Sequence, residues 1–187
     1  IATAMRRGIS RGVFSNEAGL GSAPIAHAAA TTDHPVRQGL WGVFEVFMDT
    51  IVICSLTALA IMVSGLWDSG VTGAALTTQA FNESIPGGGI IVSIGIVLFA
   101  FSTILGWAYY GERCAEYLLG KGAIMPYRII WIPAVILGAV GGLEFLWDLA
   151  DTLNGLMAIP NLIGVLLMSG TIIALTKEYF AKEKTAK

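Results

Sequence analysis

Residues 10–30 read SRGVFSNEAGLGSAPIAHAAA, and this stretch decides the fold class of the chain. It places Asn16 and Glu17 among small and apolar residues, together with three glycines and a proline. Glycine destabilises a helix interior by about 0.8–1 kcal/mol relative to alanine, and proline cannot donate a hydrogen bond to the preceding turn. The pattern predicts two half-helices joined by unwound backbone between Asn16 and Gly21, with Ser22 as N-cap of the second.

The composition of the whole chain indicates that lipid surrounds it. Hydrophobic residues make up 55% of the 187 residues and charged residues only 13%, with a mean hydropathy of +0.73. A soluble domain carries about 25% charged residues. The net charge of −2 offers no basic surface for nucleic acid. The chain begins at Ile1 in mid-pattern and without a signal segment, so we expect it to be a piece of a longer protein.

The sequence predicts five membrane-embedded helical segments in a single transmembrane domain. Every backbone polar group must be satisfied inside a bilayer, so apolar runs of this length form helices. No run alternates with the period of a barrel strand. The predicted class is therefore an all-α membrane protein. The segments are a broken helix over residues 1–30 and spans over residues 40–67, 90–111, 127–142 and 148–176.

Lysine and arginine in the short loops predict the orientation. Residues 177–187 form a tail that holds Lys177, Lys182, Lys184 and Lys187, and we expect this tail to be cytoplasmic. Counting back, the predicted inner loops carry lysine or arginine, whereas the predicted outer loops carry none. The expected location is the plasma (inner) membrane, with a cytoplasmic C-terminus.

Polar residues inside the predicted segments leave two interpretations open. Glu45 and Asp49 are four residues apart and share a helix face. Intramembrane carboxylates are usually functional, but these two can also pair with the arginines of residues 6–11. His27 either takes part in proton transfer or is a hydrogen-bonded structural histidine.

The predicted break in the first segment has a chemical use. Irregular backbone at membrane depth is tolerated where it is buried in protein or lines a cavity, and broken helices offer their backbone groups to ions and substrates. Carbonyl groups there can coordinate Na⁺ or accept from an ammonium group, and N–H groups of the second half-helix can receive a carboxylate. The alternative is a structural kink in which Glu17 pairs with an arginine.

Several motifs resemble one family. The string RGVFSNEAGLGSAPIAHAAA closely resembles the signature of the alanine or glycine:cation symporter family, the sodium:alanine symporters. Three further stretches are similar to that family, so the resemblance covers essentially the whole chain. They are GLWGVFEVFMDT at residues 39–50, FSTILGWAYYGER at residues 101–113 and DTLNGLMAIPNLI at residues 151–163.

The resemblance implies a LeuT-type fold of two inverted five-helix repeats. The chain would hold the second repeat only, and the missing N-terminal repeat of the same protein would be its partner. The implied function is secondary active transport of small neutral amino acids, alanine or glycine, by symport with Na⁺; coupling to H⁺ stays open. The lipid bilayer is the other implied partner, and the resemblance implies no enzyme activity and no cofactor besides the coupling ion.

The resemblance also implies site residues. The implied substrate-binding residues are Phe14, Ser15, Asn16, Glu17, Gly19, Thr103 and Trp107. Ser102 and Thr103 fall where the fold contributes to a sodium site, and Na⁺ prefers oxygen ligands. Trp107 would limit the size of the substrate. Alternatively, Ser102 and Thr103 satisfy backbone carbonyls of their own helix, and Trp107 is an anchor at the membrane interface.

Other functions remain as rivals. A hydrolytic triad of Ser15, His27 and Asp33 is disfavoured because no GxSxG turn surrounds the serine. A channel, a non-transporting membrane subunit, or an inactive truncated fragment of a transporter would all share the composition described above.

Overall fold

The computed structural model describes residues 2–185, with the side chains of all of these except residues 143, 144 and 183–185. This part of the chain is helical and contains no strand, which confirms the predicted all-α class. It forms two compact units. The first unit comprises the residues up to 47 together with those from 132 onward, and the second comprises residues 48–131.

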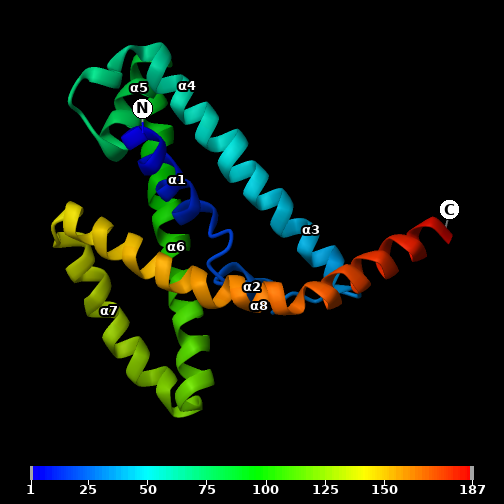
Figure 1. The fold of residues 1–187 in the computed structure, drawn as a ribbon. Helices are drawn as coiled ribbons and strands as arrows, with labels where there is room; N and C mark the ends of the chain where they lie inside the picture. The colour runs from blue at the N-terminus through cyan, green and yellow to red at the C-terminus, as the bar shows by residue number, and fades with distance from the viewer. Residues whose placement is uncertain (1, 186–187) are drawn as a thin grey trace. The chain divides into compact units, whose positions relative to one another are not determined.

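Four helices lie wholly within the first unit, which also holds the part of α7 from residue 132 onward. Both α1 and α3 pack against α8, and α2 packs against α3 (Figure 1). The helix α3 begins at a proline, and the Nδ1 atom of its N-cap His34 accepts a hydrogen bond from the backbone N–H of Val36 at 3.3 Å. The bounds are α1 Ala2–Asn16, α2 Ala23–His27, α3 Pro35–Val46 and α8 Leu143–Thr185, which continues through Pro160.

The second unit is built around α6. A π-helix, η1, continues α3 into α4, and α5 packs against both α4 and α6. A side chain at Gly88 would overlap the carbonyl group of Phe81, so the start of α6 lies directly on α5. At its other end, the carboxylate of Glu112 accepts from Arg128 Nη2 at 2.9 Å, which ties α6 to α7. The bounds are η1 Phe47–Ile53, α4 Cys54–Ser64, η2 Leu66–Asp68, α5 Gly73–Ser84, α6 Gly88–Leu119, η3 Lys121–Ala123 and α7 Ile124–Val140.

Four helical segments of the described residues are long and apolar enough to cross a membrane. They are Pro35–Ser64, Gly88–Leu119, Lys121–Val140 and Phe145–Lys182. Each overlaps one predicted span, whereas α1 and α2, with 15 and 5 residues, are short. The helices run past the apolar stretches because backbone hydrogen bonding continues until a breaking residue stops it, while hydropathy marks only the part suited to lipid.

Two regions outside the predicted spans contain helix. The outer loop expected between the second and third spans contains α5, and most of the predicted tail continues α8. Neither has the apolar run from which the spans were predicted. Lys187 and the side chain of Lys184, both used to orient the tail, lie outside the described residues.

Candidate functional site

The first unit contains a break between α1 and α2, here called the unwound segment (residues 17–22). The helix α1 ends at Asn16 and α2 begins at Ala23, so the break lies where the glycines and the proline predict it. Three residues of the segment have positive φ: Glu17 at 54°, Gly19 at 86° and Gly21 at 84°. Glycine reaches this region without strain, whereas a residue with a Cβ atom rarely adopts it.

Side chains of the segment hold its own backbone in place. The Oδ1 atom of Asn16 accepts a hydrogen bond from the backbone N–H of Ala18 at 2.9 Å, a local turn that competes with continuation of α1. The hydroxyl of Ser22 donates to the carboxylate of Glu17 at 2.6 Å, and Ser22 is only 2% exposed. Ser22 occupies the predicted N-cap position, but its hydroxyl makes no capping hydrogen bond, because Glu17 engages it instead. The partner of Glu17 is thus a serine within the segment.

Several carbonyl groups of the segment remain available. The carbonyl of Glu17 accepts from the backbone N–H of Leu20 at 3.1 Å, and that of Gly19 accepts from Asn161 at 3.0 Å. Within the described residues, the carbonyls of Ala18, Leu20 and Gly21 accept no hydrogen bond. Unpaired carbonyl groups of this kind can bind a cation or an ammonium group.

A cavity of about 690 Å³ adjoins the unwound segment. Residues of the segment, α2, α3 and α8 line it, among them Asn16, Glu17, Gly19, His27, Glu45 and Asn161. Three of these are predicted substrate-binding residues, so the structure gathers that part of the prediction around one cavity. Asn161 was not predicted; the only signal in the sequence is a polar residue directly after Pro160 within an apolar run.

His27 joins α2 to α3 across this cavity. Its Nε2 atom lies 3.1 Å from the carboxylate of Glu45, and its Nδ1 atom lies 2.8 Å from the Nε2 atom of Gln38. With the amide of Gln38 donating, Nδ1 is the acceptor and Nε2–H donates to Glu45. Glu45 therefore pairs with a histidine, not with an arginine, and His27 has the hydrogen-bonded structural environment that was one of its two interpretations.

The same contacts oppose the hydrolytic triad. Both ring nitrogens of His27 are engaged by Gln38 and Glu45. Asp33 accepts instead from the guanidinium of Arg37 at 3.3 Å. Hydrogen bonds from its own backbone and from Arg37 hold the pKa of Asp33 below its ordinary value. The histidine and the aspartate of the supposed triad therefore serve different partners.

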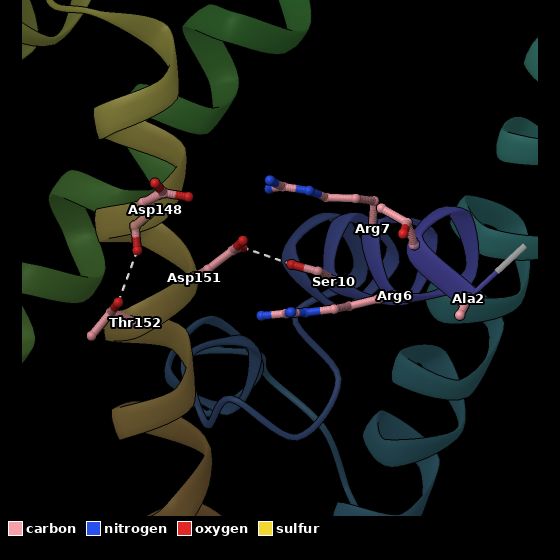
Figure 2. A pocket seen from close by; sticks show the side chains of 8 residues that line it. Ala2, Arg6, Arg7, Ser10, Asp148, Asp151 and Thr152 are labelled. Carbon is pink, nitrogen blue, oxygen red and sulfur yellow. Dashed lines mark hydrogen bonds between the residues drawn. The ribbon is translucent and has the colours of Figure 1, made fainter.

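A second, polar cavity of about 640 Å³ lies between α1 and α8. Figure 2 shows Arg6 and Arg7 extending from α1 towards α8, on either side of the hydrogen bond between Ser10 and Asp151. The Ser10 hydroxyl donates to Asp151 at 2.7 Å. The guanidinium of the next residue, Arg11, lies 3.2 Å from the same carboxylate. The arginines of α1 thus face carboxylates of α8, and only Arg11 forms an ion pair among the described residues.

Trp147 of α8 contacts both Arg11 and the predicted site residue Phe14. The guanidinium of Arg11 lies 3.7 Å from the ring centroid of Trp147, a cation–π contact. The ring of Trp147 packs edge-on against Phe14, with centroids 5.2 Å apart. Phe14 is therefore held from the α8 side by the same tryptophan that holds Arg11.

Ser15, another predicted site residue, lies in the last turn of α1. The other three, Ser102, Thr103 and Trp107, lie on α6 of the second unit. The Ser102 hydroxyl donates to the carbonyl of Phe99 at 3.0 Å, as the structural alternative predicts. The Thr103 hydroxyl has no partner within the described residues, although Thr78 and Thr176 donate to carbonyls one turn back in their helices at 2.8 Å. Trp107 packs edge-on against Tyr110, with centroids 6.0 Å apart.

Comparisons with known proteins place these features in context. The model of the sodium:alanine symporter family matches residues 1–187. The sodium/alanine symporter AgcS of Methanococcus maripaludis is 54% identical to the chain over 183 residues, which are 96% of the chain and 40% of that protein. The probable sodium/glutamine symporter GlnT of Bacillus subtilis is 40% identical over 190 residues, 100% of the chain and 40% of that protein.

The name of a more distant relative includes the proton as well as sodium. The putative sodium/proton-dependent alanine carrier protein YrbD of Bacillus subtilis is 33% identical over 203 residues, 98% of the chain and 42% of that protein. The chain therefore spans about two fifths of the length of these relatives. No solved structure matches it.

Proposed function

Because this chain belongs to the sodium:alanine symporter family, we propose that it forms the C-terminal part of a transporter that carries small neutral amino acids, alanine or glycine, together with Na⁺. It is an integral membrane protein, as its family and its four apolar helices indicate. The observation that carries the proposal is the unwound segment, which combines unpaired carbonyl groups with an adjoining cavity.

The segment supplies the chemistry that a zwitterionic substrate needs. The carbonyls of Ala18, Leu20 and Gly21 are available to an ammonium group or to Na⁺. The segment is pre-arranged by three hydrogen bonds: the N–H of Ala18 donates to Asn16, the Ser22 hydroxyl donates to Glu17, and Asn161 of α8 donates to the Gly19 carbonyl, so little ordering remains to oppose binding. We assign substrate contacts in the first unit to Phe14, Ser15, Asn16, Glu17 and Gly19.

In the second unit we assign Thr103 and Trp107 to the substrate and Ser102 and Thr103 to Na⁺. The unpaired hydroxyl of Thr103 supports this assignment. The Ser102 oxygen keeps lone pairs for an ion even while it donates its proton to Phe99. Binding of ion and substrate to one closed state would couple them, and this coupling is reciprocal in binding free energy.

The fold completes the proposal. We assign α1–α2, the three following long apolar segments and α8 to the second repeat of a LeuT-type fold, with the first repeat supplied by the part of the relatives' length that this chain does not span. The chain joined to that part is called the complete transporter below. Its C-terminus is assigned to the cytoplasm on the charge of the tail.

Uptake into proteoliposomes tests the function. Radiolabelled alanine and glycine are offered to vesicles that contain the complete transporter, with an inward Na⁺ gradient, with a proton gradient, or with neither. We expect saturable accumulation that requires the Na⁺ gradient. Competition by unlabelled glutamine measures how large a side chain the substrate site accepts. Accumulation driven by protons alone would contradict the ion assignment. Flux that neither saturates nor depends on a gradient would support a channel instead.

A further inference from the structure

Asn161 of α8 touches the unwound segment at two points. Its Nδ2 atom donates a hydrogen bond to the carbonyl of Gly19 at 3.0 Å, across 142 residues of sequence. A Cβ atom at Gly21 would lie 2.9 Å from the Oδ1 atom of Asn161, closer than such atoms approach in proteins. The segment therefore rests directly on this side chain, through one polar contact and one close steric contact.

The bond to Gly19 orients more than one carbonyl. The peptide group is planar, so fixing the Gly19 carbonyl also fixes the N–H of Leu20. The carbonyl groups of Ala18 and Leu20 lie in the two neighbouring peptide planes. Only the φ and ψ angles of Gly19 separate the first of these from the fixed plane, and only those of Leu20 separate the second. Both of these carbonyls are unpaired within the described residues. Without Asn161, the glycines on either side of Leu20 would leave the segment a wide range of conformations.

We propose that Asn161 is a positioning residue: it holds the carbonyl groups of the unwound segment in the arrangement that binds ion and substrate, without touching either. This rests on the function proposed above for the segment. The role differs from simple packing because it depends on the amide proton and not only on the shape of the side chain.

Two substitutions of Asn161 distinguish the effect of its amide donor from the effect of its side-chain shape, and a substitution at another position is the control. Asn161→Asp keeps the shape and replaces the donor by an acceptor, whereas Asn161→Ala removes both contacts. Asn154→Ala truncates the other asparagine of α8, two turns earlier on the same face; it is 8% exposed and makes no hydrogen bond within the described residues. All are made in the complete transporter.

The first readout is the affinity for radiolabelled alanine in Na⁺, measured on detergent-solubilised protein. Loss of one positioning hydrogen bond should weaken binding about fivefold to tenfold in both Asn161 variants. The control should bind as the wild type does. If Asn161→Asp binds as the wild type while Asn161→Ala does not, shape alone matters and the proposal is overturned. It is equally overturned if Asn154→Ala weakens binding as much as Asn161→Ala.

The second readout needs no substrate and so separates this inference from the proposed function. A single cysteine is placed at the exposed Ala18, with Cys54 and Cys114 replaced by serine, and its labelling by a thiol reagent is timed in the absence of substrate and Na⁺. Release of the segment should speed labelling about fivefold in both Asn161 variants but not in the control. Unchanged labelling would overturn the proposal. Faster labelling in a protein that binds no alanine would retain Asn161 as the residue that holds the segment and reject the transport function.

Discussion

The guanidinium carbon of Arg11 on α1 lies 3.7 Å from the ring centroid of Trp147 on α8. The same guanidinium is 3.2 Å from the carboxylate of Asp151, which also accepts from Ser10. Two adjacent residues of α1 are thus held by two residues of α8, one turn before Phe14. This contact sets the position of the end of α1 from which the unwound segment departs.

Breaking the pair should destabilise the first unit. Asp151→Ala removes the partner of Arg11 and of Ser10, and each lost hydrogen bond is worth about 1 kcal/mol, somewhat more with a charged acceptor. We expect a loss of about 1–3 kcal/mol, seen as a lower midpoint of thermal unfolding in detergent. A double-mutant cycle with Arg11→Ala measures the coupling; strictly additive losses would mean that the two side chains do not interact.

The contact between His27 and Glu45 should depend little on charge. The Nε2–H of His27 donates to Glu45 at 3.1 Å, and an amide oxygen at residue 45 can accept that hydrogen bond as the carboxylate does. Glu45→Gln keeps an acceptor for the histidine and should barely change the unfolding midpoint. His27→Ala leaves the amide of Gln38 without its partner on the histidine ring, and this variant should lower the unfolding midpoint more than Glu45→Gln does. Equal losses in the two variants would show that the negative charge of Glu45 is required.

Asn16 has a local role and a proposed substrate role that can be separated. Asn16→Ala removes the acceptor of the Ala18 N–H and should reduce alanine uptake at least about tenfold, with membrane insertion unchanged. Asn16→Asp retains an acceptor for that N–H. Recovery of uptake in the aspartate variant would assign Asn16 to the turn alone, and continued loss would support direct contact with the substrate. Full uptake in the alanine variant would remove Asn16 from the site.

Ser102 and Thr103 should set the sodium dependence. The double variant Ser102→Ala/Thr103→Ala removes two hydroxyl oxygens proposed to bind Na⁺ and should raise the Na⁺ concentration for half-maximal uptake by about tenfold. Ser93→Ala is the matched control, because the Ser93 hydroxyl also donates to a backbone carbonyl of α6, that of Gly89, at 2.8 Å. An unshifted sodium dependence in the double variant would count against these ligands.

Trp107 should limit the substrate by size. Trp107→Ala opens space, so uptake of larger neutral amino acids such as leucine should rise relative to alanine, as measured by competition. A difference of one methylene group in an apolar pocket corresponds to about 10–200-fold in selectivity. If the variant keeps the wild-type preference, Trp107 acts as an anchor at the membrane interface. Trp67, which is 68% exposed, provides a control tryptophan.

The amino-acid sequence by itself determined the helical class and the location of the break. Both depend on near neighbours: apolar runs mark the helices that suit lipid, and the glycines and proline of residues 12–24 stop the backbone ladder locally. The motifs also determined the family, because each is a contiguous string. The helix ends and α5 were missed, since a polar helical stretch leaves no hydropathy signal.

Only the tertiary structure decided which side chains hold the break. Asn161 reaches Gly19 across 142 residues and Ser10 reaches Asp151 across 141, while Glu45 pairs with His27 instead of an arginine. Any of several polar side chains satisfies the same local rules, so propensity and spacing cannot choose among them. The choice is made by the packing of α1 and α3 on α8, which brings particular donors and acceptors within hydrogen-bonding distance and keeps others out of reach.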